Sequence, residues 1–148
     1  MEECGQSIDL SNTSLKPMNI LMVEDNRLDA LLTSEILSES EKNLYQIKEV
    51  KDGIEAIAYL RGCSNSGSAL PDLILLDLNL PRMNGFDFLD EITKTEDLKT
   101  IPVFILTTSS DEEDVEKVQE FVDSYLLKPL DLEEFETAVS RIGKVRPD

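Results

Sequence analysis

The sequence predicts an α/β fold in which a five-stranded parallel sheet is covered by helices on both faces. Three short apolar runs, at 19–23, 73–76 and 103–106, have the composition of strands that are buried on both sides. A segment with helical spacing follows each run, and two further strand–helix units complete the pattern. Strict alternation of strands and helices is typical of a parallel sheet, because each helix returns the chain to the same end of the sheet.

Five segments have strand character, and they lie at 19–23, 45–50, 73–76, 103–106 and 124–127. The first, third and fourth are continuously apolar, so we place them in the centre of the sheet. The segment 45–50 interleaves polar and apolar residues, which predicts a strand at an edge of the sheet.

Five segments have helical spacing, and they cover 25–40, 53–61, 84–94, 111–122 and 131–143. The apolar residues of the first recur on one face, and we expect this stripe to belong to the core: Leu28, Leu31, Leu32 and Ile36. Asp131 suits the N-cap of the last helix and Gly143 suits its end.

The chain of 148 residues fits a single domain. We expect residues 1–17, which are polar and lack periodicity, to form a flexible tail, and residues 18–148 to form the domain. The stretch GCSNSGSALP (62–71) is expected to be one long flexible loop.

Charge and composition exclude several classes of function. The net charge of −17 repels phosphate backbones and anionic lipids, so we expect neither nucleic-acid nor membrane binding. The chain start lacks the features of a signal peptide, which predicts a cytoplasmic protein. Histidine is absent, and this excludes histidine-based zinc sites and catalytic triads.

Polar side chains follow four of the five predicted strands, namely Glu24, Asp25, Asp77, Thr107 and Lys128. The carboxyl ends of parallel strands share one rim, so we expect these side chains to converge. Three neighbouring carboxylates repel one another unless a cation joins them, and oxygen ligands favour Mg²⁺. A metal ion, an ammonium and a hydroxyl around one carboxylate suit transfer of a phosphoryl group onto it, and Asp77 on the central strand is the best nucleophile.

Four blocks resemble the signature blocks of bacterial response-regulator receiver domains, in the order of that family: MVEDN, LILLDLNLPRMNG, PVFILTTSS and YLLKPL. The resemblance covers residues 19–143 and implies a flavodoxin-like doubly wound (βα)5 fold with strand order 2-1-3-4-5. It implies that Asp77 is the phosphoacceptor and that Glu24 and Asp25 are the acidic pair for Mg²⁺. Asp25 and Asp77 would be direct ligands, and Glu24 would act through water.

The resemblance also implies roles for residues outside the acidic set. The main-chain carbonyl of Asn79 would bind the metal, and the Thr107 hydroxyl would move onto a phosphoryl oxygen. Tyr125 would be the aromatic residue that turns inward with it. Lys128 would pair with the phosphoryl group, and the Lys128–Pro129 peptide would be cis.

Three departures from the family pattern are visible. The spacing from Thr107 to Lys128 is one residue short and Phe121 replaces a frequent glycine, so we expect an altered fourth helix and exit. Thr108 is bulkier than the usual small residue and should restrict access to the phosphoryl pocket. The loop 62–71 is longer than usual, and with the LDLNLP and TTSS blocks it resembles the stand-alone regulators that are paired with bacterial phytochromes.

The resemblance implies a single-domain response regulator without an attached output domain. A sensor histidine kinase, a bacterial phytochrome in the closest subfamily, would phosphorylate Asp77 with Mg²⁺ and so change the partner-binding surface of the fourth helix, fifth strand and fifth helix. Such a switch is not an enzyme, although it assists its own phosphorylation and dephosphorylation. The expected outputs are a downstream protein partner, a phosphotransfer protein or a homodimer.

Two other functions remain open on the sequence. A phosphatase of the haloacid-dehalogenase type also forms an aspartyl phosphate, but it needs a second acid where this chain has Asn79. A receiver-like module that binds partners without phosphorylation is the other alternative, and the intact acidic set disfavours it.

Each site residue also has an ordinary structural interpretation. Asp77 alone would be read as a strand-end cap, Glu24 and Asp25 as a helix N-cap, and Lys128 as a solvated charge. Tyr125 is as well explained by packing on an edge strand as by switching. The coincidence of five strand-end residues favours the functional interpretation.

Overall fold

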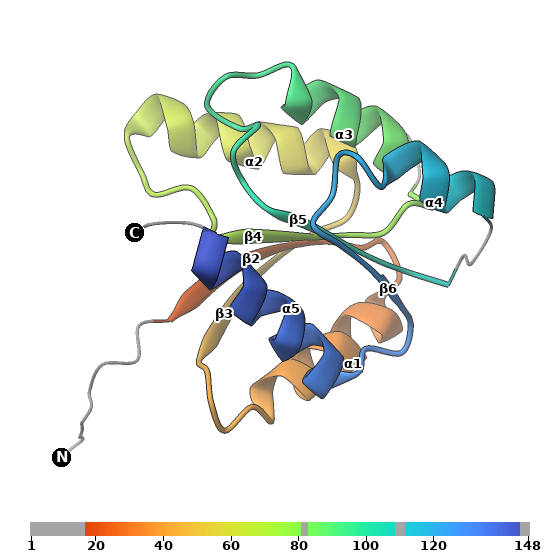
Figure 1. The fold of residues 1–148 in the computed structure, drawn as a ribbon. Coiled ribbons are helices and arrows are strands. Elements are labelled where there is room, and N and C mark those ends of the chain that lie inside the picture. Colours follow the sequence, from red (N-terminus) through yellow and green to blue (C-terminus); the bar gives the residue numbers. More distant parts are fainter. Residues whose placement is uncertain (1–16, 81–82, 109–111, 146–148) are drawn as a thin grey trace, which may run out of the picture.

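The computed structural model describes residues 17–80, 83–108 and 112–145. In this part of the chain one parallel sheet contains five strands: β2 (Met18–Val23), β3 (Tyr45–Val50), β4 (Leu73–Leu76), β5 (Val103–Thr107) and β6 (Ser124–Leu127). Their order is β3-β2-β4-β5-β6, which places the second strand of the chain at an edge (Figure 1). The predicted flavodoxin-like fold and strand order 2-1-3-4-5 are confirmed.

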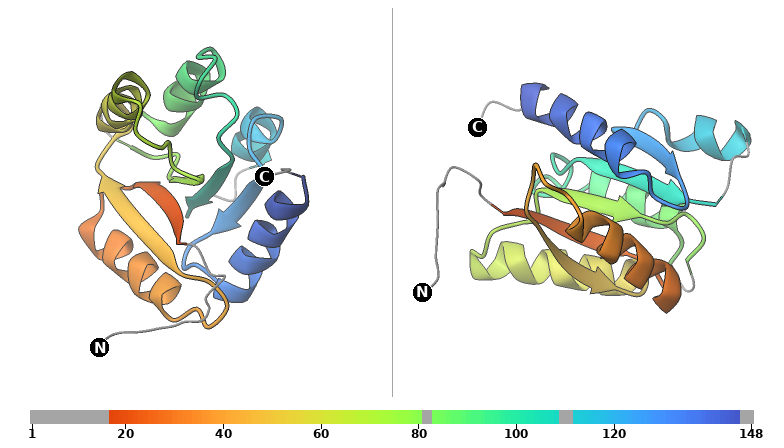
Figure 2. Two further views of the ribbon diagram at one scale, coloured as in Figure 1. Left: turned by 90° about the vertical axis from the view of Figure 1, so that its left-hand side faces the viewer. Right: turned by 90° about the horizontal axis from the view of Figure 1, so that it is seen from below.

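Helices cover both faces of the sheet: α1 (Arg27–Ser38), α2 (Gly53–Ser66), α3 (Gly85–Thr93), α4 (Glu112–Val118) and α5 (Leu132–Val145). Figures 1 and 2 show α2, α3 and α4 on one face and α1 and α5 on the other. Alternate residues of the strands point to opposite faces and build two cores, in which Phe88 packs on the α2–α4 side and Phe104 and Phe135 pack on the α1–α5 side. The central strands are therefore buried on both faces.

Side-chain caps set the start of four helices. The side chains of Asn26, Asp52, Asn84 and Asp131 each accept a hydrogen bond, of 2.9–3.2 Å, from a backbone N–H in the first helical turn. The predicted role of Asp131 as an N-cap is confirmed. At the start of α1 the cap is Asn26, so the structural reading of Glu24 and Asp25 as caps of this helix is wrong.

The prediction that the apolar stripe of the first helix is core is wrong for three leucines. The buried residues of α1 are Ala30, Thr33 and Leu37. The leucines of the predicted stripe are 76%, 56% and 47% exposed, in the order Leu28, Leu31 and Leu32. The segment contains two interleaved sets with helical spacing, and the set that faces the sheet includes two residues smaller than leucine, Ala30 and Thr33. We call Leu28, Leu31 and Leu32 the α1 leucine surface.

Three predicted element boundaries are also corrected. The helix α2 continues to Ser66, so the first half of the predicted loop 62–71 is helical and Gly67, at φ 76°, ends it. The helix α4 ends at Val118 and not at 122, because the backbone turns there and Phe121 N–H donates to the Val118 carbonyl at 2.8 Å. The helix α5 runs through Gly143 to Val145, so this glycine is not its stop.

Gly85 lets α3 begin directly against the end of β4. Its N–H donates to the Leu78 carbonyl at 3.1 Å. A Cβ at this position would lie 2.7 Å from Leu78 Cα and 2.9 Å from the Asp77 carbonyl oxygen, distances that backbone atoms cannot accept without moving. The absence of a side chain at Gly85 therefore allows the start of α3 to lie against the backbone of Asp77 and Leu78.

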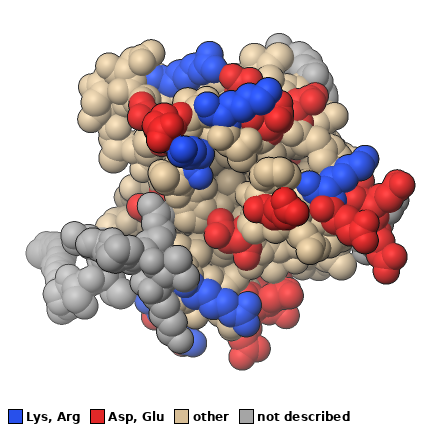
Figure 3. All heavy atoms as spheres, turned by 45° about the horizontal axis from the view of Figure 1, so that its top comes forward, with Lys and Arg blue, Asp and Glu red and all other residues tan. Residues whose placement is uncertain are grey.

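The predicted tail, 1–17, lies outside the described residues except for Pro17. Among the described helices, none has the length and apolar character that a membrane crossing requires. Figure 3 shows basic and acidic side chains mixed over one face of the molecule, with acidic side chains gathered at one end. The helix α4 contains four acids: Glu112, Glu113, Asp114 and Glu116.

Candidate functional site

The structure brings the strand-end residues together at one rim of the sheet. The backbone ladder continues one residue beyond three of the strands. The N–H groups of Glu24, Asp77 and Lys128 donate to the carbonyls of the neighbouring strands at 2.9, 3.2 and 2.8 Å. These hydrogen bonds place the backbones of the three residues side by side, although the residues are far apart in the sequence.

Asp77 lies at the centre of the site and is 7% exposed. One carboxylate oxygen, Oδ1, accepts from the Thr107 hydroxyl at 3.0 Å and from the Asn79 N–H at 3.1 Å. The other, Oδ2, accepts from the Lys128 ammonium at 2.9 Å. These three donors compensate the cost of burying the carboxylate at the end of an apolar strand.

Lys128 contacts three carboxylates. Its Nζ lies 2.6 Å from Glu24 Oε1, 2.9 Å from Asp29 Oδ2 and 2.9 Å from Asp77 Oδ2. Burial opposes its charge, but these hydrogen bonds outweigh burial and raise the pKa of the Lys128 ammonium above its ordinary value. Lys128 is therefore a charged side chain held in place by three carboxylates, and the alternative reading of it as an ordinary solvated charge is wrong.

Three carboxylates at the rim form a group with the geometry of a metal site. Oxygens of Glu24, Asp25 and Asp77 all lie within 4.8 Å of one another, and Asp25 is the exposed member. Burial raises the pKa of the Glu24 carboxyl, and the charge of Asp77 adds to this effect against the hydrogen bonds from Lys128 and Asn26. A cluster of oxygen ligands with excess negative charge suits a divalent cation, so the residues fit the ion that the sequence predicts.

Of the remaining predicted residues, Asn79 and Thr108 lie at the rim, whereas Tyr125 lies inside β6. Asn79 is exposed next to Asp77, and Thr108 is exposed beyond β5. Tyr125 lies on β6 opposite Ile105 and packs, half-buried, against the core on the α2–α4 side. The Lys128–Pro129 peptide is cis, as the resemblance implies.

Asp29, the third carboxylate partner of Lys128, is not among the residues predicted from the sequence. Its signal is its position, four residues after Asp25 and in the first turn of a helix that starts at the rim. The N-cap of this helix, Asn26, directly follows the acidic pair, so an acid in the first helical turn stays close to the strand-end residues.

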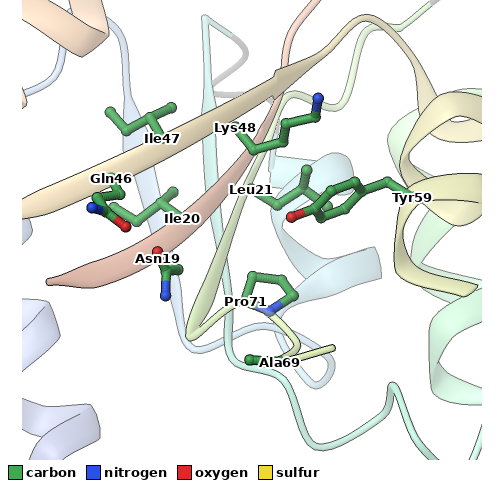
Figure 4. Close-up of a pocket in the computed structure, with 9 residues that line it drawn as sticks. All are labelled: Asn19, Ile20, Leu21, Gln46, Ile47, Lys48, Tyr59, Ala69 and Pro71. Atoms are coloured by element: carbon green, nitrogen blue, oxygen red, sulfur yellow. The ribbon is translucent and has the colours of Figure 1, made fainter. Parts of the chain in front are cut away.

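A second hollow lies away from the rim (Figure 4). This cavity of about 310 Å³ lies between β2, β3 and α2, and Lys48 lies over the ring of Tyr59 at 5.6 Å from its centroid. Among the described residues that line it there is no carboxylate, and it adjoins the first half of β2, whereas Glu24 follows the end of that strand. The acidic site and this cavity are therefore separate features.

Comparison with known proteins agrees with the geometry. A model of the response regulator receiver domain matches residues 20–140. The response regulator Rcp1 of Synechocystis sp. is 41% identical over 127 residues, which cover 84% of this chain and 86% of Rcp1. The probable methanogenesis regulatory protein FilR2 of Methanothrix harundinacea is 39% identical over 129 residues, which cover 85% of this chain and 81% of FilR2.

Solved structures show the same likeness. The Mn²⁺-bound form of Rcp1 matches with a TM-score of 0.68 at 41% identity, over 82% of this chain and 89% of that one. The phosphorylated cyanobacterial phytochrome response regulator RcpA matches with a TM-score of 0.69 at 39% identity, over 86% and 91% of the two chains. The predicted resemblance to phytochrome-associated regulators is thus confirmed. The fold, the site and these matches show that the chain belongs to the response regulator receiver family.

Proposed function

We propose that this chain is a phosphorylation switch that accepts a phosphoryl group on Asp77 with the help of Mg²⁺. The observation that carries the proposal is the environment of Asp77. Its carboxylate is buried between an ammonium at 2.9 Å and a hydroxyl at 3.0 Å, beside two further carboxylates that suit a divalent cation. This arrangement offers one nucleophile and several groups that stabilise negative charge on a transferred phosphoryl group.

The transfer forms one bond and breaks another. A carboxylate oxygen of Asp77 bonds to the phosphorus of a donor phosphohistidine, and the phosphorus–nitrogen bond breaks with its electron pair passing to the imidazole, which takes up a proton. Lys128 neutralises charge on the phosphoryl oxygens, and Thr107 donates a hydrogen bond to them in place of Asp77. Because this chain contains no histidine, the donor is another molecule.

Glu24, Asp25 and Asp77 would hold the ion, together with the main-chain carbonyl of Asn79. Asp25 and Asp77 would bind it directly and Glu24 through water. When bound, Mg²⁺ supplies positive charge that offsets the charge of the phosphoryl oxygens. Mn²⁺ binding by the relative Rcp1 supports a divalent cation here, and the all-oxygen ligand set favours Mg²⁺.

The switch would act through Thr107 and Tyr125. Movement of the Thr107 hydroxyl onto a phosphoryl oxygen would release space beside β5, and Tyr125 on the adjacent strand would turn toward it. This would change the surface formed by α4, β6 and α5. That surface would bind a downstream protein, a phosphotransfer protein or a second copy of this chain.

A cytoplasmic sensor histidine kinase is the proposed donor, and the description of RcpA as a phytochrome response regulator supports a kinase of the phytochrome type. The α1 leucine surface also supports a protein donor. It lies on α1, and Asp29 in the first turn of this helix contacts Lys128, which also contacts Asp77. A protein bound to these leucines would therefore lie close to Asp77. In this role the chain is a phosphoacceptor and not an enzyme with sustained turnover.

Acetyl phosphate with Mg²⁺ tests the proposal. Intact mass should show a gain of one phosphoryl group in the parent and none in Asp77→Asn. Equal labelling of the two proteins would mean that another residue is the acceptor. Sustained hydrolysis of p-nitrophenyl phosphate would instead indicate the phosphatase alternative, and the absence of both labelling and a response to beryllofluoride would indicate a binding module that is not phosphorylated.

A further inference from the structure

Asp29 differs from the other two carboxylates that contact Lys128. Glu24 and Asp77 follow strands and have side chains only 6% and 8% exposed, whereas Asp29 lies in the first turn of α1 with its side chain 37% exposed. Asp29 is also absent from the group of oxygens that could hold a metal ion among the described residues. It therefore pairs with the lysine without belonging to the metal site.

A ring of polar contacts through Asn26, Glu24 and Lys128 fixes the position of Asp29 relative to the lysine. The Asp29 N–H donates to Asn26 Oδ1 at 3.0 Å, and the Asn26 N–H donates to Glu24 Oε2 at 3.1 Å. Glu24 Oε1 pairs with Lys128 at 2.6 Å, and Lys128 Nζ donates to Asp29 Oδ2 at 2.9 Å. The first turn of α1 and the lysine thus hold each other in place.

Two of the three partners of Lys128, Glu24 and Asp77, also belong to the group of oxygens that could hold a metal ion. A bound divalent ion would compete with the ammonium for Glu24 and Asp77, because a double charge attracts a carboxylate more strongly than a single charge does, and these two carboxylates would then hold the lysine less firmly. An ammonium has three donor protons, and the three carboxylates occupy all of them in this structure. Asp29 lies outside the group of oxygens that could hold the metal ion, so its hydrogen bond to Lys128 would be unaffected by metal binding.

We propose that Asp29 is a positioning residue that keeps the Lys128 ammonium directed at Asp77 when a bound metal ion competes with the lysine for Glu24. One N–H group of the Lys128 ammonium stays hydrogen-bonded to Asp29. The N–H group that no longer binds Glu24 becomes available to a phosphoryl oxygen. This inference rests on the proposed function, because it assigns Asp29 a part in the same phosphoryl transfer. It acts through Lys128 and does not contact the reacting atoms.

The variants Asp29→Ala and Asp29→Asn test this role, with Glu35→Ala as the matched control. Glu35 is an exposed acid on the same helix, and its removal changes the net charge equally. The rate of phosphorylation is measured against acetyl phosphate concentration at saturating Mg²⁺, and Mg²⁺ affinity is measured separately by calorimetry.

We expect Asp29→Ala to lower the rate at saturating donor about tenfold, as loss of one hydrogen bond to a charged group implies. Mg²⁺ affinity should stay within about twofold, since the metal ligands are unchanged. Asp29→Asn should recover part of the rate because its amide oxygen still accepts from Lys128, and Glu35→Ala should match the parent. An Asp29→Ala rate equal to or above that of the parent overturns the inference, as does a parallel loss of Mg²⁺ affinity.

Crystal structures of the parent and Asp29→Ala with Mg²⁺ provide a readout that needs no phosphorylation. We expect Lys128 Nζ to leave hydrogen-bond distance of Asp77 in the variant and to remain there in the parent. A lysine that stays in place in the variant overturns the positioning role. If the parent and Glu35→Ala both fail to take up label, the proposed function fails, while the two structures still decide whether Asp29 positions the lysine.

Discussion

The Thr107 hydroxyl donates to the Asp77 carboxylate across 3.0 Å, and Thr107 is fully buried at 0% exposure. Thr107 lies at the end of β5, and its register partner on the edge strand β6 is Leu127. We expect a change at the Asp77 carboxylate to reach this edge of the sheet through Thr107.

Replacing Thr107 should separate phosphorylation from switching. Thr107→Val keeps the shape of the side chain but removes the donor, so beryllofluoride with Mg²⁺ should still bind while NMR shift changes in α4, β6 and α5 shrink markedly. Thr107→Ser retains the hydroxyl and should give changes close to those of the parent. Full-sized shift changes in the valine variant would show that the signal takes another route.

Removing the cation from the site should destabilise the protein in a way that Mg²⁺ reverses. Lys128→Met leaves Glu24, Asp29 and Asp77 without their shared ammonium. Breaking a largely buried ion pair in this way costs about 3 kcal/mol of unfolding free energy. Urea unfolding with and without Mg²⁺ measures the effect, and added Mg²⁺ should restore more stability to the variant than to the parent. An equal gain in both proteins would contradict the idea that the metal and the lysine share these carboxylates.

The fold followed from the sequence because its strongest signals are local. The apolar strands and their alternation with helices determine the sheet. The polar residues after four of the five strands therefore meet at one rim, although they are far apart in the sequence. The missed features depend on tertiary context. The choice between the leucines and the Ala30–Leu37 set in α1 is made by the space above the sheet, and both sets have helical spacing.

Two further differences have similar causes. Asp29 is an ordinary first-turn acid until the cation that it pairs with, 99 residues away, is known. The extension of α2 through Gly62 and Cys63 shows that a stretch rich in glycine and serine continues as a helix when its buried face, here Leu60 and Cys63, still meets the core.

The α1 leucine surface should contribute little to stability and much to recognition. Leu31→Ser should change the unfolding free energy by less than about 0.5 kcal/mol, as expected of an exposed position. Leu37→Ala, at a residue that is 1% exposed, should cost about 2–5 kcal/mol. Phosphorylation of Leu31→Ser by acetyl phosphate should equal that of the parent, while transfer from a cognate kinase should slow. A large loss of stability in Leu31→Ser would show that the side chain is buried.

Gly85 and Gly62 form a matched pair of helical glycines with opposite expected effects. Gly85→Ala places a methyl group 2.7 Å from Leu78 Cα and should lower the unfolding free energy by about 1–3 kcal/mol. Gly62→Ala meets nothing within 4 Å and should raise it by about 0.5–1 kcal/mol, since alanine favours a helix interior. Thermal unfolding measures both changes. The Gly85 variant should also phosphorylate more slowly because the backbone of Asp77 has to move, and unchanged kinetics would contradict the close approach.

Glu136 should make stability depend on acidic pH. Its Oε2 accepts from Asn43 at 3.0 Å, from the Tyr45 hydroxyl at 2.9 Å and from Ser40, so it joins α5 to the loop after α1 and to the start of β3. Burial raises the pKa of this carboxyl, but the three hydrogen bonds outweigh burial, and the pKa of Glu136 lies below its ordinary value.

A carboxyl with a lowered pKa stabilises the fold fully above its pKa in the unfolded chain, and this contribution disappears as the pH falls through the lower, folded-state pKa. Glu136→Gln should therefore cost about 1 kcal/mol at neutral pH, and the difference from the parent should shrink as the pH falls below about 4. Glu133→Gln, an exposed neighbour on α5, controls for the change in net charge. Denaturant unfolding across this pH range measures the difference, and a gap between Glu136→Gln and the parent that is constant with pH would show that the ionised carboxylate has no special role.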